Sequence, residues 1–553
     1  MPISYWAKYA WLVVGAATLV IEAWLLGDWI VDDAGITFAY ARNAAEGHGW
    51  VTFPGEVPVE GFTNLAWASL IRLLLALGVF DVVVAPKVLG ALCAIIALGL
   101  VQSAVRQSYR VTGMVVFLPL LLLASHPTFA VWSLSGLENG LTAVLVAGML
   151  AVLTRPNALS SLRMALVCGL LAGAAAANRP DGVVLAAWYP LTAILSAERP
   201  SSQHVRRSVA ALATTFTCVA LFTVWRLVTF GEPVPNTFFA KVGDPLGRIL
   251  PAAASAALLL LSLWVRLRVW PRSLVAGCLH AAVVCAGIML TTGSGAVRSL
   301  GGELGLPLLA CAMVLIGPAD KGRNAAWAAG SILCLFLYES LPPDWMGLHR
   351  FGTPFLVVSL PWLVMQLLSR SQSASRNRRT LWRALACAAC LLIGWRSMEK
   401  TSDFLEHPTV PMHGIERRHQ VFASWAAECS RAPATVGVAD VGGALWSRTL
   451  QVVDLAGLCD AKIARLIHDP PSLAHYILYQ RRPTFLEFHG DWTDRVGLLQ
   501  HPDFLQIYEP VVQWHRPFTG NDDDAPTVSG GVYVIREQAP EVAILESWRR
   551  QWR

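Results

Sequence analysis

Long apolar stretches recur along most of this chain, and they constrain its fold more than any other feature. A stretch of about 20 apolar residues can cross the hydrocarbon core of a bilayer as a helix. Stretches of spanning or near-spanning length fill most of the first 398 residues, so the sequence predicts a polytopic α-helical membrane protein. The stretches are 9–27, 62–80, 87–104, 111–125, 132–153, 161–178, 182–197, 208–229, 250–266, 273–292, 302–317, 324–341, 352–369 and 381–397.

The composition agrees with a chain that lies largely in lipid. Hydrophobic residues make up 55% of the 553 residues and charged residues only 14%, with a mean hydropathy of +0.50. A net charge of +6 would suit a nucleic-acid partner. The Lys and Arg residues, however, fall in short clusters between apolar stretches, which is typical of cytoplasmic loops and argues against nucleic acid.

The basic clusters also predict the topology. By the positive-inside rule they lie in the cytoplasm, so the intervening loops and the C-terminal part face outward across the inner (plasma) membrane. Strict alternation requires either that 62–80 is a re-entrant or interfacial helix that does not cross, or that a neighbouring short stretch is miscounted. The favoured topology has about 13 transmembrane helices with the N-terminus inside. The clusters are Arg106/Arg110, Arg155/Arg163, Arg199/Arg206/Arg207, Arg266/Arg268/Arg272, Lys321/Arg323 and Arg370 to Arg383.

From about Glu399 the composition becomes that of a soluble domain. Short β-like runs alternate there with helical and Gly/Pro-rich segments, which predicts a small extracytoplasmic α/β domain over 399–553 after a transmembrane domain over 1–398. Its two cysteines, Cys429 and Cys459, could form a disulfide in an oxidising compartment, and whether they pair stays open. The acidic run from Asp522 to Asp524 is typical of a solvated turn. The β-like runs are Thr435 to Ala439, Gln451 to Val453, Thr484 to Phe488 and Gly531 to Ile535.

The richest polar stretch follows the first apolar stretch and begins with two adjacent acids, Asp32 and Asp33. Two neighbouring carboxylates at a membrane surface resist ionising together, so one of them could have a raised pKa and serve as a base. Acids at a helix N-terminus are also stabilised by capping and by the helix dipole, and this structural interpretation stays open. The same loop is dense in side chains suited to binding a hydroxylated ligand. These are Arg42, Asn43, His48, Glu60, Thr63 and Asn64.

Several motifs in chain order resemble those of the GT-C glycosyltransferase superfamily. The first loop, DDAGITFAYARNAAEGHGW followed by VEGFTN, resembles the branch of mycobacterial terminal β-(1→2)-arabinofuranosyltransferases. Singly each motif is weak, but jointly they are specific. The further matches are Ser135 to Asn139 (SGLEN), Arg179 to Gly182 (RPDG), Gly231 to Lys241 (GEPVPNTFFAK), Arg350-Phe351, and Val453 to Leu458 (VDLAGL).

The resemblance implies an inverting transferase that moves a sugar, arabinofuranose in that branch, from a polyprenyl-phosphate donor to a cell-envelope glycan or glycolipid. Asp33, or Asp32, would deprotonate the acceptor hydroxyl, and it need not bind a metal to do so. A divalent cation as cofactor stays open. Arg179, Lys241 and Arg350 would hold the donor phosphate, because desolvated cations stabilise a departing phosphate best. The alternative for each cation is snorkelling to lipid headgroups.

The remaining candidates would bind or organise the substrates. Glu138 begins an apolar stretch, where an acid is costly unless it faces a cavity or a partner. The full set is Arg42, Asn43, His48, Glu60, Asn64, Glu138, Asp181 and Asn236. Two other functions stay open: a protein O-glycosyltransferase of the same superfamily, and a transporter or flippase of lipid-linked glycans. The chain lacks the repeated halves typical of transporters.

Overall fold

A computed structural model describes most of the chain, in two compact units. The described residues are 10–109, 117–197, 201–241, 249–250, 252–254, 256–261, 321–341, 344–373, 376–429, 433–515 and 528–552. The expected spans at 273–292 and 302–317, and the run from Asp522 to Asp524, lie outside them. The bundle unit comprises Met1–Asp28, Asp81–Phe222 and Asp244–Thr409, and the sheet unit comprises Trp29–Phe80, Thr223–Gly243 and Val410–Arg553. The domain division at 398/399 stays a prediction.

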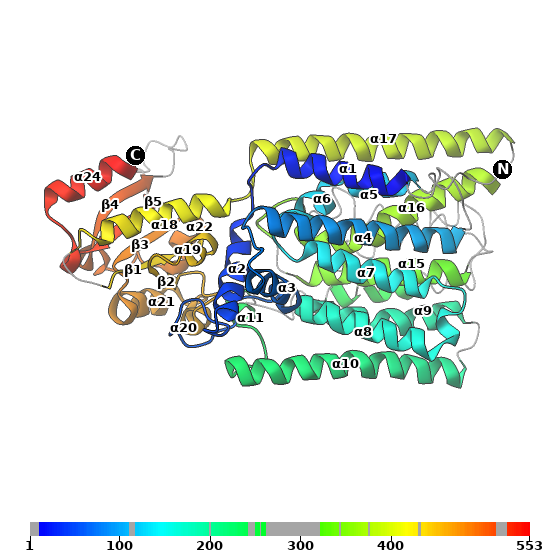
Figure 1. The fold of residues 1–553 in the computed structure, drawn as a ribbon, viewed down its shortest axis with the longest axis horizontal. Helices are drawn as coiled ribbons and strands as arrows, with labels where there is room; N and C mark the ends of the chain where they lie inside the picture. The colour runs from blue at the N-terminus through cyan, green and yellow to red at the C-terminus, as the bar shows by residue number, and fades with distance from the viewer. Residues whose placement is uncertain are drawn as a thin grey trace. The chain divides into compact units, whose positions relative to one another are not determined.

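The bundle unit consists of helices that run alongside one another (Figure 1). Large side chains such as Trp188, Trp327 and Trp362 fill its core. The helices are α1 (Ala10–Leu25), α4 (Val84–Tyr109), α5 (Phe117–Ala124), α6 (Pro127–Ser133), α7 (Asn139–Leu153), α8 (Leu162–Asn178), α9 (Trp188–Ser196), α10 (Ser202–Phe230), α15 (Lys321–Ser340), α16 (Thr353–Ser373) and α17 (Arg376–Glu406), with short 3₁₀ helices at Ala158–Ser160, Pro180–Ala187 and Arg350–Gly352.

Four helices among the described residues are long and apolar enough to cross a membrane: Val84–Tyr109, Ser202–Phe230, Arg350–Ser371 and Arg379–Glu406. Large apolar side chains on α10 and α17, such as Leu221 and Leu391, are exposed, which is expected of helices that face lipid. The count of 13 spans stays a prediction. Helix α3 (Leu65–Ala76) has 12 residues. At 1.5 Å per residue it is shorter than the hydrocarbon core of about 30 Å, and the non-crossing assignment of 62–80 stays a prediction.

The sheet unit contains a mixed five-stranded sheet in the order β2-β1-β3-β5-β4. Strands β2, β1 and β3 are parallel, whereas β5 is antiparallel to both β3 and β4. The four runs predicted from the sequence correspond to β1, β2, β3 and β5. The strands are β1 (Thr435–Val438), β2 (Gln451–Asp454), β3 (Phe485–His489), β4 (Tyr508–His515) and β5 (Val528–Ile535).

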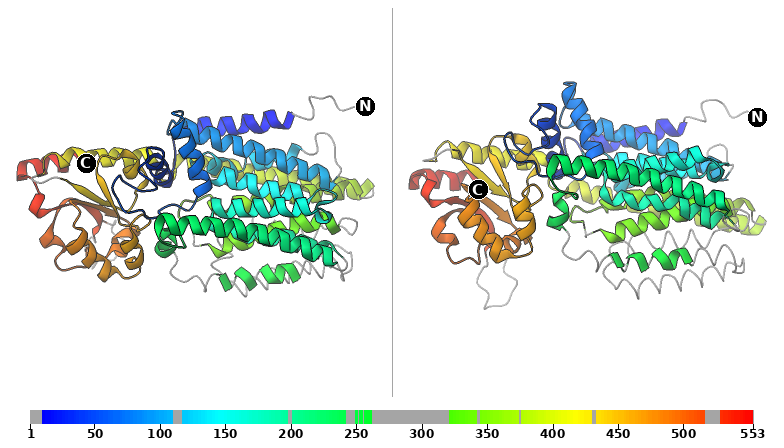
Figure 2. Two further views of the ribbon diagram at one scale, coloured as in Figure 1. Left: turned by 60° about the horizontal axis from the view of Figure 1, so that its bottom comes forward. Right: turned by 90° about the horizontal axis from the view of Figure 1, so that it is seen from below.

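Helices cover both faces of this sheet (Figure 2). One face packs against α18 and α24, with Phe422, Trp425 and Trp548 in the shared core, and the other packs against α20 to α23. The helices are α18 (Met412–Ala426), α19 (Gly442–Ser447), α20 (Ala461–Leu466), α21 (Pro470–Tyr476), α22 (Asp491–Val496), α23 (Phe504–Ile507) and α24 (Val542–Trp552). The expected α/β domain is therefore a three-layer structure.

The first loop belongs to the sheet unit. It forms α2 (Asp32–Ala45) and α3, and Ile36 and Tyr40 of α2 share a hydrophobic core with Phe422 and Phe485. The backbone of Ile30 and Asp32 also forms hydrogen bonds with Met412 and Val410. The sheet unit also includes the end of α10 and α11 (Asn236–Lys241). Three segments far apart in the sequence thus fold as one body.

Candidate active site

The SGLEN motif forms the tight turn that begins α7. The Ser135 hydroxyl donates to the Trp132 carbonyl at 2.9 Å, and Gly136 has a φ of 90°, which favours glycine. The turn lies against α4, where a Cβ on Gly90 would lie 1.8 Å from the Ser133 carbonyl oxygen. This packing fixes the two polar side chains that follow, Glu138 and Asn139, at the N-terminal end of α7.

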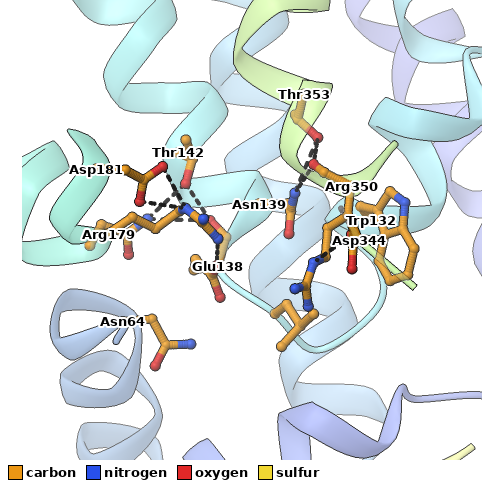
Figure 3. Close-up of polar contacts among 12 residues, drawn as sticks. Asn64, Trp132, Glu138, Asn139, Thr142, Arg179, Asp181, Asp344, Arg350 and Thr353 are labelled. Carbon is orange, nitrogen blue, oxygen red and sulfur yellow. Dashed lines mark hydrogen bonds and ion pairs between the residues drawn. The ribbon is translucent and has the colours of Figure 1, made fainter. Parts of the chain in front are cut away.

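Arg179 follows α8 and lies between two carboxylates (Figure 3). Its Nη1 atom lies 2.8 Å from Glu138 Oε1, and its Nε atom lies 3.2 Å from Asp181 Oδ1. Glu138 precedes α7 and Asp181 follows α8, so antiparallel neighbours bring the SGLEN and RPDG motifs to one end of the bundle unit. A guanidinium has five N–H donors, so two carboxylates orient Arg179 without exhausting it.

Arg350 is held at the N-terminal end of α16 by a strained loop. Leu348 and His349 have φ values of 46° and 48°, a left-handed conformation that is costly for side chains other than glycine and concentrates at functional sites. The Thr128 hydroxyl donates to the Leu348 carbonyl at 2.7 Å. Arg350 Nε then lies 3.2 Å from Asp344 Oδ2.

Phe351 brings the two arginines together. The guanidinium carbon of Arg179 lies 4.3 Å from the centroid of the Phe351 ring, and that of Arg350 lies 4.4 Å from the same centroid. Such cation–π contacts strengthen where the groups are desolvated. The RPDG motif and the Arg350-Phe351 motif therefore converge on one ring.

The structure separates the three proposed phosphate ligands by exposure. The side chains of Arg179 and Arg350 are only 16% and 7% exposed, and both form ion pairs with acids of the bundle unit, so neither snorkels outward. Lys241 is exposed at the end of α11, in the sheet unit. Snorkelling therefore stays open for Lys241 alone.

In the sheet unit, Asp32 is committed to the backbone of α19. Its Oδ2 and Oδ1 atoms accept hydrogen bonds from the amides of Gly442 and Gly443 at 3.0 and 2.7 Å. A Cβ on Gly442 would lie 1.7 Å from the Asp32 carbonyl oxygen. Asp32 is 3% exposed, whereas the neighbouring Asp33 is partly exposed. The two acids of the pair therefore occupy different environments.

Arg42 binds the other end of α19. Its Nη1 and Nη2 atoms donate to the carbonyls of Trp446 and Leu445 at 2.7 and 3.3 Å, and its guanidinium lies 4.6 Å from the Trp446 ring centroid. An acid thus contacts the N-terminus and a base the C-terminus of one short helix, which matches the polarity of its backbone dipoles.

Burial raises the pKa of Asp32 to about 8. The amides of Gly443 and Gly442 oppose this increase, and the nearby charges of Asp33 and Asp440 add to it. Burial therefore moves the titration of Asp32 toward neutral pH, mainly by desolvation rather than through its neighbour Asp33.

The other polar candidates of the sheet unit hold segments of the chain together. The Asn43 amide donates to the carbonyls of Val51 and Thr52 at 2.7 and 2.9 Å. Asn64 precedes α3 and accepts from the Thr37 hydroxyl at 3.2 Å. His48 is 43% exposed and lies 3.6 Å from Glu46.

Two further candidates tie the α10–α11 segment to the rest of the sheet unit. Glu60 forms a buried two-pronged ion pair with Arg226. The Asn236 amide donates to the carbonyls of Gly457 and Leu458 at 2.8 and 2.9 Å. These contacts link the PNT motif to the VDLAGL motif.

Sequence reasoning missed three polar residues of these arrangements: Arg226, Asp344 and Asn139. Arg226 lies within an apolar stretch taken as a span, and a charge at such a position is itself a signal of a buried partner. Asp344 lies six residues before Arg350 in a short polar loop. Asn139 directly follows Glu138, and it enters the sequence analysis only as the last residue of the SGLEN motif, without a role of its own.

Among the described residues, no group of three or more His, Cys, Asp or Glu side chains is arranged to hold a metal ion. Both oxygens of Asp32 accept backbone amides.

Known structures identify the fold. An oligosaccharyltransferase from Archaeoglobus fulgidus, crystallised with zinc and sulfate, is similar with a TM-score of 0.54 at 10% identity, over 94% of this chain and 73% of that chain. Its apo form gives a TM-score of 0.50 at 10% identity, over 95% and 75%. The chain therefore shares the fold of this oligosaccharyltransferase. Two other solved proteins are more distant from this chain in structure.

The first of these is the arabinofuranosyltransferase AftD from Mycobacteria, with a TM-score of 0.47 at 14% identity over 95% of this chain and 40% of that chain. The second is ArnT from Cupriavidus metallidurans bound to undecaprenyl phosphate, with a TM-score of 0.43 at 16% identity over 97% and 100%. Residues 412–550 match a family described as a domain of unknown function (DUF8728). No curated protein matches this chain.

Proposed function

We propose that this protein is a membrane glycosyltransferase that moves a sugar from a polyprenyl-phosphate donor to a hydroxyl of a cell-envelope glycan or glycolipid. The observation that carries the proposal is the pair of guanidinium groups, Arg350 buried and Arg179 largely shielded, at one Phe351 ring in a chain with the GT-C fold. Burial strengthens the attraction of a guanidinium for phosphate, because water no longer screens the charge. The first-loop motif supports arabinofuranose as the sugar.

The acids around the two arginines prepare the site before the donor arrives. Glu138 and Asp181 contact Arg179, and Asp344 contacts Arg350. These ion pairs hold each guanidinium in one orientation, so little reorganisation is needed when negative charge develops on the phosphate. The strained backbone at Leu348 and His349 serves the same purpose for Arg350.

Asp33 is the proposed general base. It removes the proton from the acceptor hydroxyl, the oxygen forms a bond to the anomeric carbon of the sugar, and the bond from that carbon to the phosphate oxygen breaks. Polyprenyl phosphate leaves with the electron pair of the broken bond. One displacement inverts the anomeric configuration. Asp33 is preferred to Asp32 in this proposal because both oxygens of Asp32 accept backbone amides, which suits a role in positioning the N-terminus of α2.

The test is transfer by the purified full-length protein in lipid. Donors would be polyprenyl-phosphate arabinofuranose, the same lipid carrying other sugars, and nucleotide sugars, each offered with glycan, glycolipid and peptide acceptors. We expect inverted product from a lipid-linked donor only. Transfer from a nucleotide sugar would contradict the proposal. Movement of the lipid-linked sugar across the bilayer without bond formation would favour a flippase, and transfer to the peptide would favour a protein glycosyltransferase.

A further inference from the structure

Asn139 is a buried amide in the arginine cluster of the bundle unit, and its donor half is fully used. Its Nδ2 atom donates to the Arg350 carbonyl at 2.8 Å and to the Thr353 hydroxyl at 3.1 Å. An amide nitrogen has two N–H groups, so both are satisfied. A carbonyl oxygen only accepts, and the contact with Arg350 therefore fixes which end of the amide is nitrogen.

The acceptor half of the same amide has no partner in the described structure. Asn139 is 5% exposed, and its Oδ1 atom is buried and accepts no hydrogen bond. The great majority of buried polar atoms in proteins have a hydrogen-bond partner, and each exception calls for an explanation. In Figure 3 this oxygen points to the side on which the Glu138 carboxylate and the Arg350 guanidinium lie. The unpaired acceptor thus faces the groups proposed to hold the donor.

We propose that Asn139 Oδ1 accepts a hydrogen bond from a hydroxyl of the donor sugar and so helps to set which sugar the enzyme takes. This inference rests on the proposed function. Within a polyprenyl-phosphate sugar, the phosphodiester oxygens only accept hydrogen bonds and the isoprenoid chain has no polar group. The sugar hydroxyls are the donors of such a ligand, and only they can satisfy a carbonyl acceptor.

A hydrogen bond of this kind gives strong selectivity. A site built to pair with a substrate hydroxyl rejects an analogue that lacks it, because the protein atom is left buried and unpaired. The position is also rigid, since Asn139 begins α7 and its nitrogen is held by the N-terminal end of α16. Asn139 is therefore placed to discriminate among sugars rather than to take part in bond breaking.

The test is a double-mutant cycle on the full-length protein in lipid. Donors are the polyprenyl-phosphate sugar that the parent protein uses and its monodeoxy analogues, each lacking one hydroxyl. With the parent, one analogue should lose roughly tenfold to a hundredfold in kcat/KM. Asn139→Ala should lose a similar factor on the intact donor and little more on that analogue. The two losses are therefore not multiplicative if the contact exists.

Thr353→Val is the matched control, because it removes one partner of Asn139 Nδ2 and leaves Oδ1 in place. It should lower transfer from all donors by one common factor. Asn139→Ser replaces Asn139→Ala if the latter does not fold in detergent. Multiplicative losses for every analogue would overturn the inference, as would equal loss of discrimination in Thr353→Val. If the parent transfers no lipid-linked sugar at all, the proposed function itself fails, and the inference falls with it.

Discussion

The arginine cluster of the bundle unit and the α2–α19 contact of the sheet unit stabilise charge in opposite ways. In the bundle unit, charged side chains pair with other charged side chains, and a strained loop holds Arg350 beside them. In the sheet unit, Asp32 and Arg42 pair with backbone groups at the two ends of one short helix. The first arrangement leaves donors for a ligand, whereas the second uses the charges to assemble the fold.

The comparison also separates two acids that the sequence presents as a pair. Asp32 satisfies α19 and is buried, whereas Asp33 is partly exposed. Adjacent residues on a helix point in directions about 100° apart, so such a division of roles is expected when one side faces a packed neighbour. If this division holds, substitutions of Asp32 and Asp33 should affect stability and transfer differently.

The largest effect should come from Asp33. Asp33→Asn should lower transfer roughly a hundredfold to ten-thousandfold, because it removes the base while the amide keeps most capping capacity. Donor binding, measured by titration with the polyprenyl-phosphate sugar, should be unchanged. Asp32→Asn is the control, and its main loss should be in stability. A full rate in Asp33→Asn would end the division of roles.

The next effect concerns the buried arginine. Arg350→Ala should weaken use of the donor by about 1–3 kcal/mol as a lost charge-assisted contact. The variant is best made together with Asp344→Asn, because Arg350 removal alone leaves a buried carboxylate without its ion pair. Lys241→Ala is the matched control, and it should cost less because Lys241 is exposed. Equal losses in the two variants would show that burial does not distinguish the cations.

The third effect is on the stability of the sheet unit. Gly442→Ala should destabilise it by about 3 kcal/mol, because the new Cβ would meet the Asp32 backbone oxygen, which cannot move as a side chain could. Gly414→Ala in α18 is the control, since its Cβ would make only an ordinary 3.5 Å contact with Pro411. Resistance to proteolysis measures both. If the two variants are equally stable, α2 and α19 do not pack as closely as described.

The smallest effect is on pH dependence. The pKa of Asp32 is raised by burial to about 8, from an ordinary value near 4 in the unfolded chain. Between these values the folded state keeps a proton that the unfolded state has lost. Stability should therefore fall as pH rises from about 4 to about 8, by at most about 1.4 kcal/mol per pH unit.

Asp32→Asn should flatten this dependence in thermal unfolding of the full-length protein. Some slope should persist, because burial also raises the pKa of Asp454 to about 7. An unchanged slope in the variant would show that Asp32 is ionised in the folded protein. Asp454→Asn distinguishes the two contributions.

The sequence predicted the secondary structure of the C-terminal domain better than it predicted which distant residues contact one another. Four of the five strands followed from β-branched and aromatic residues between turn signals, and β4 was missed because Pro510 and its polar neighbours weaken that pattern. The resemblance to GT-C motifs predicted the fold. The motifs also marked Arg179 and Arg350, which contact one Phe351 ring, and Glu138, which pairs with Arg179.

The partners could not be predicted, because they lie far along the chain. Arg42 was expected to bind a ligand, and the loop sequence contains nothing that indicates the carbonyls of Trp446 and Leu445. The pairing of Glu60 with Arg226 could likewise not be predicted, since an ion pair between distant residues has no local sequence pattern. Local periodicity reports which face of an element is buried but not which element covers it.

The distance in sequence between Asp32 and Gly442 has a consequence for how the protein is made. The two residues are 410 positions apart. At roughly 5–20 residues per second, a ribosome needs roughly 20 to 80 s to progress from one to the other. During that interval the nascent first loop has no α19 to bind, and its buried acid and its apolar face stay open to chaperones and proteases. Synthesis of the segment that carries α19, rather than insertion of the early helices, is the event that allows this loop to reach its folded contacts.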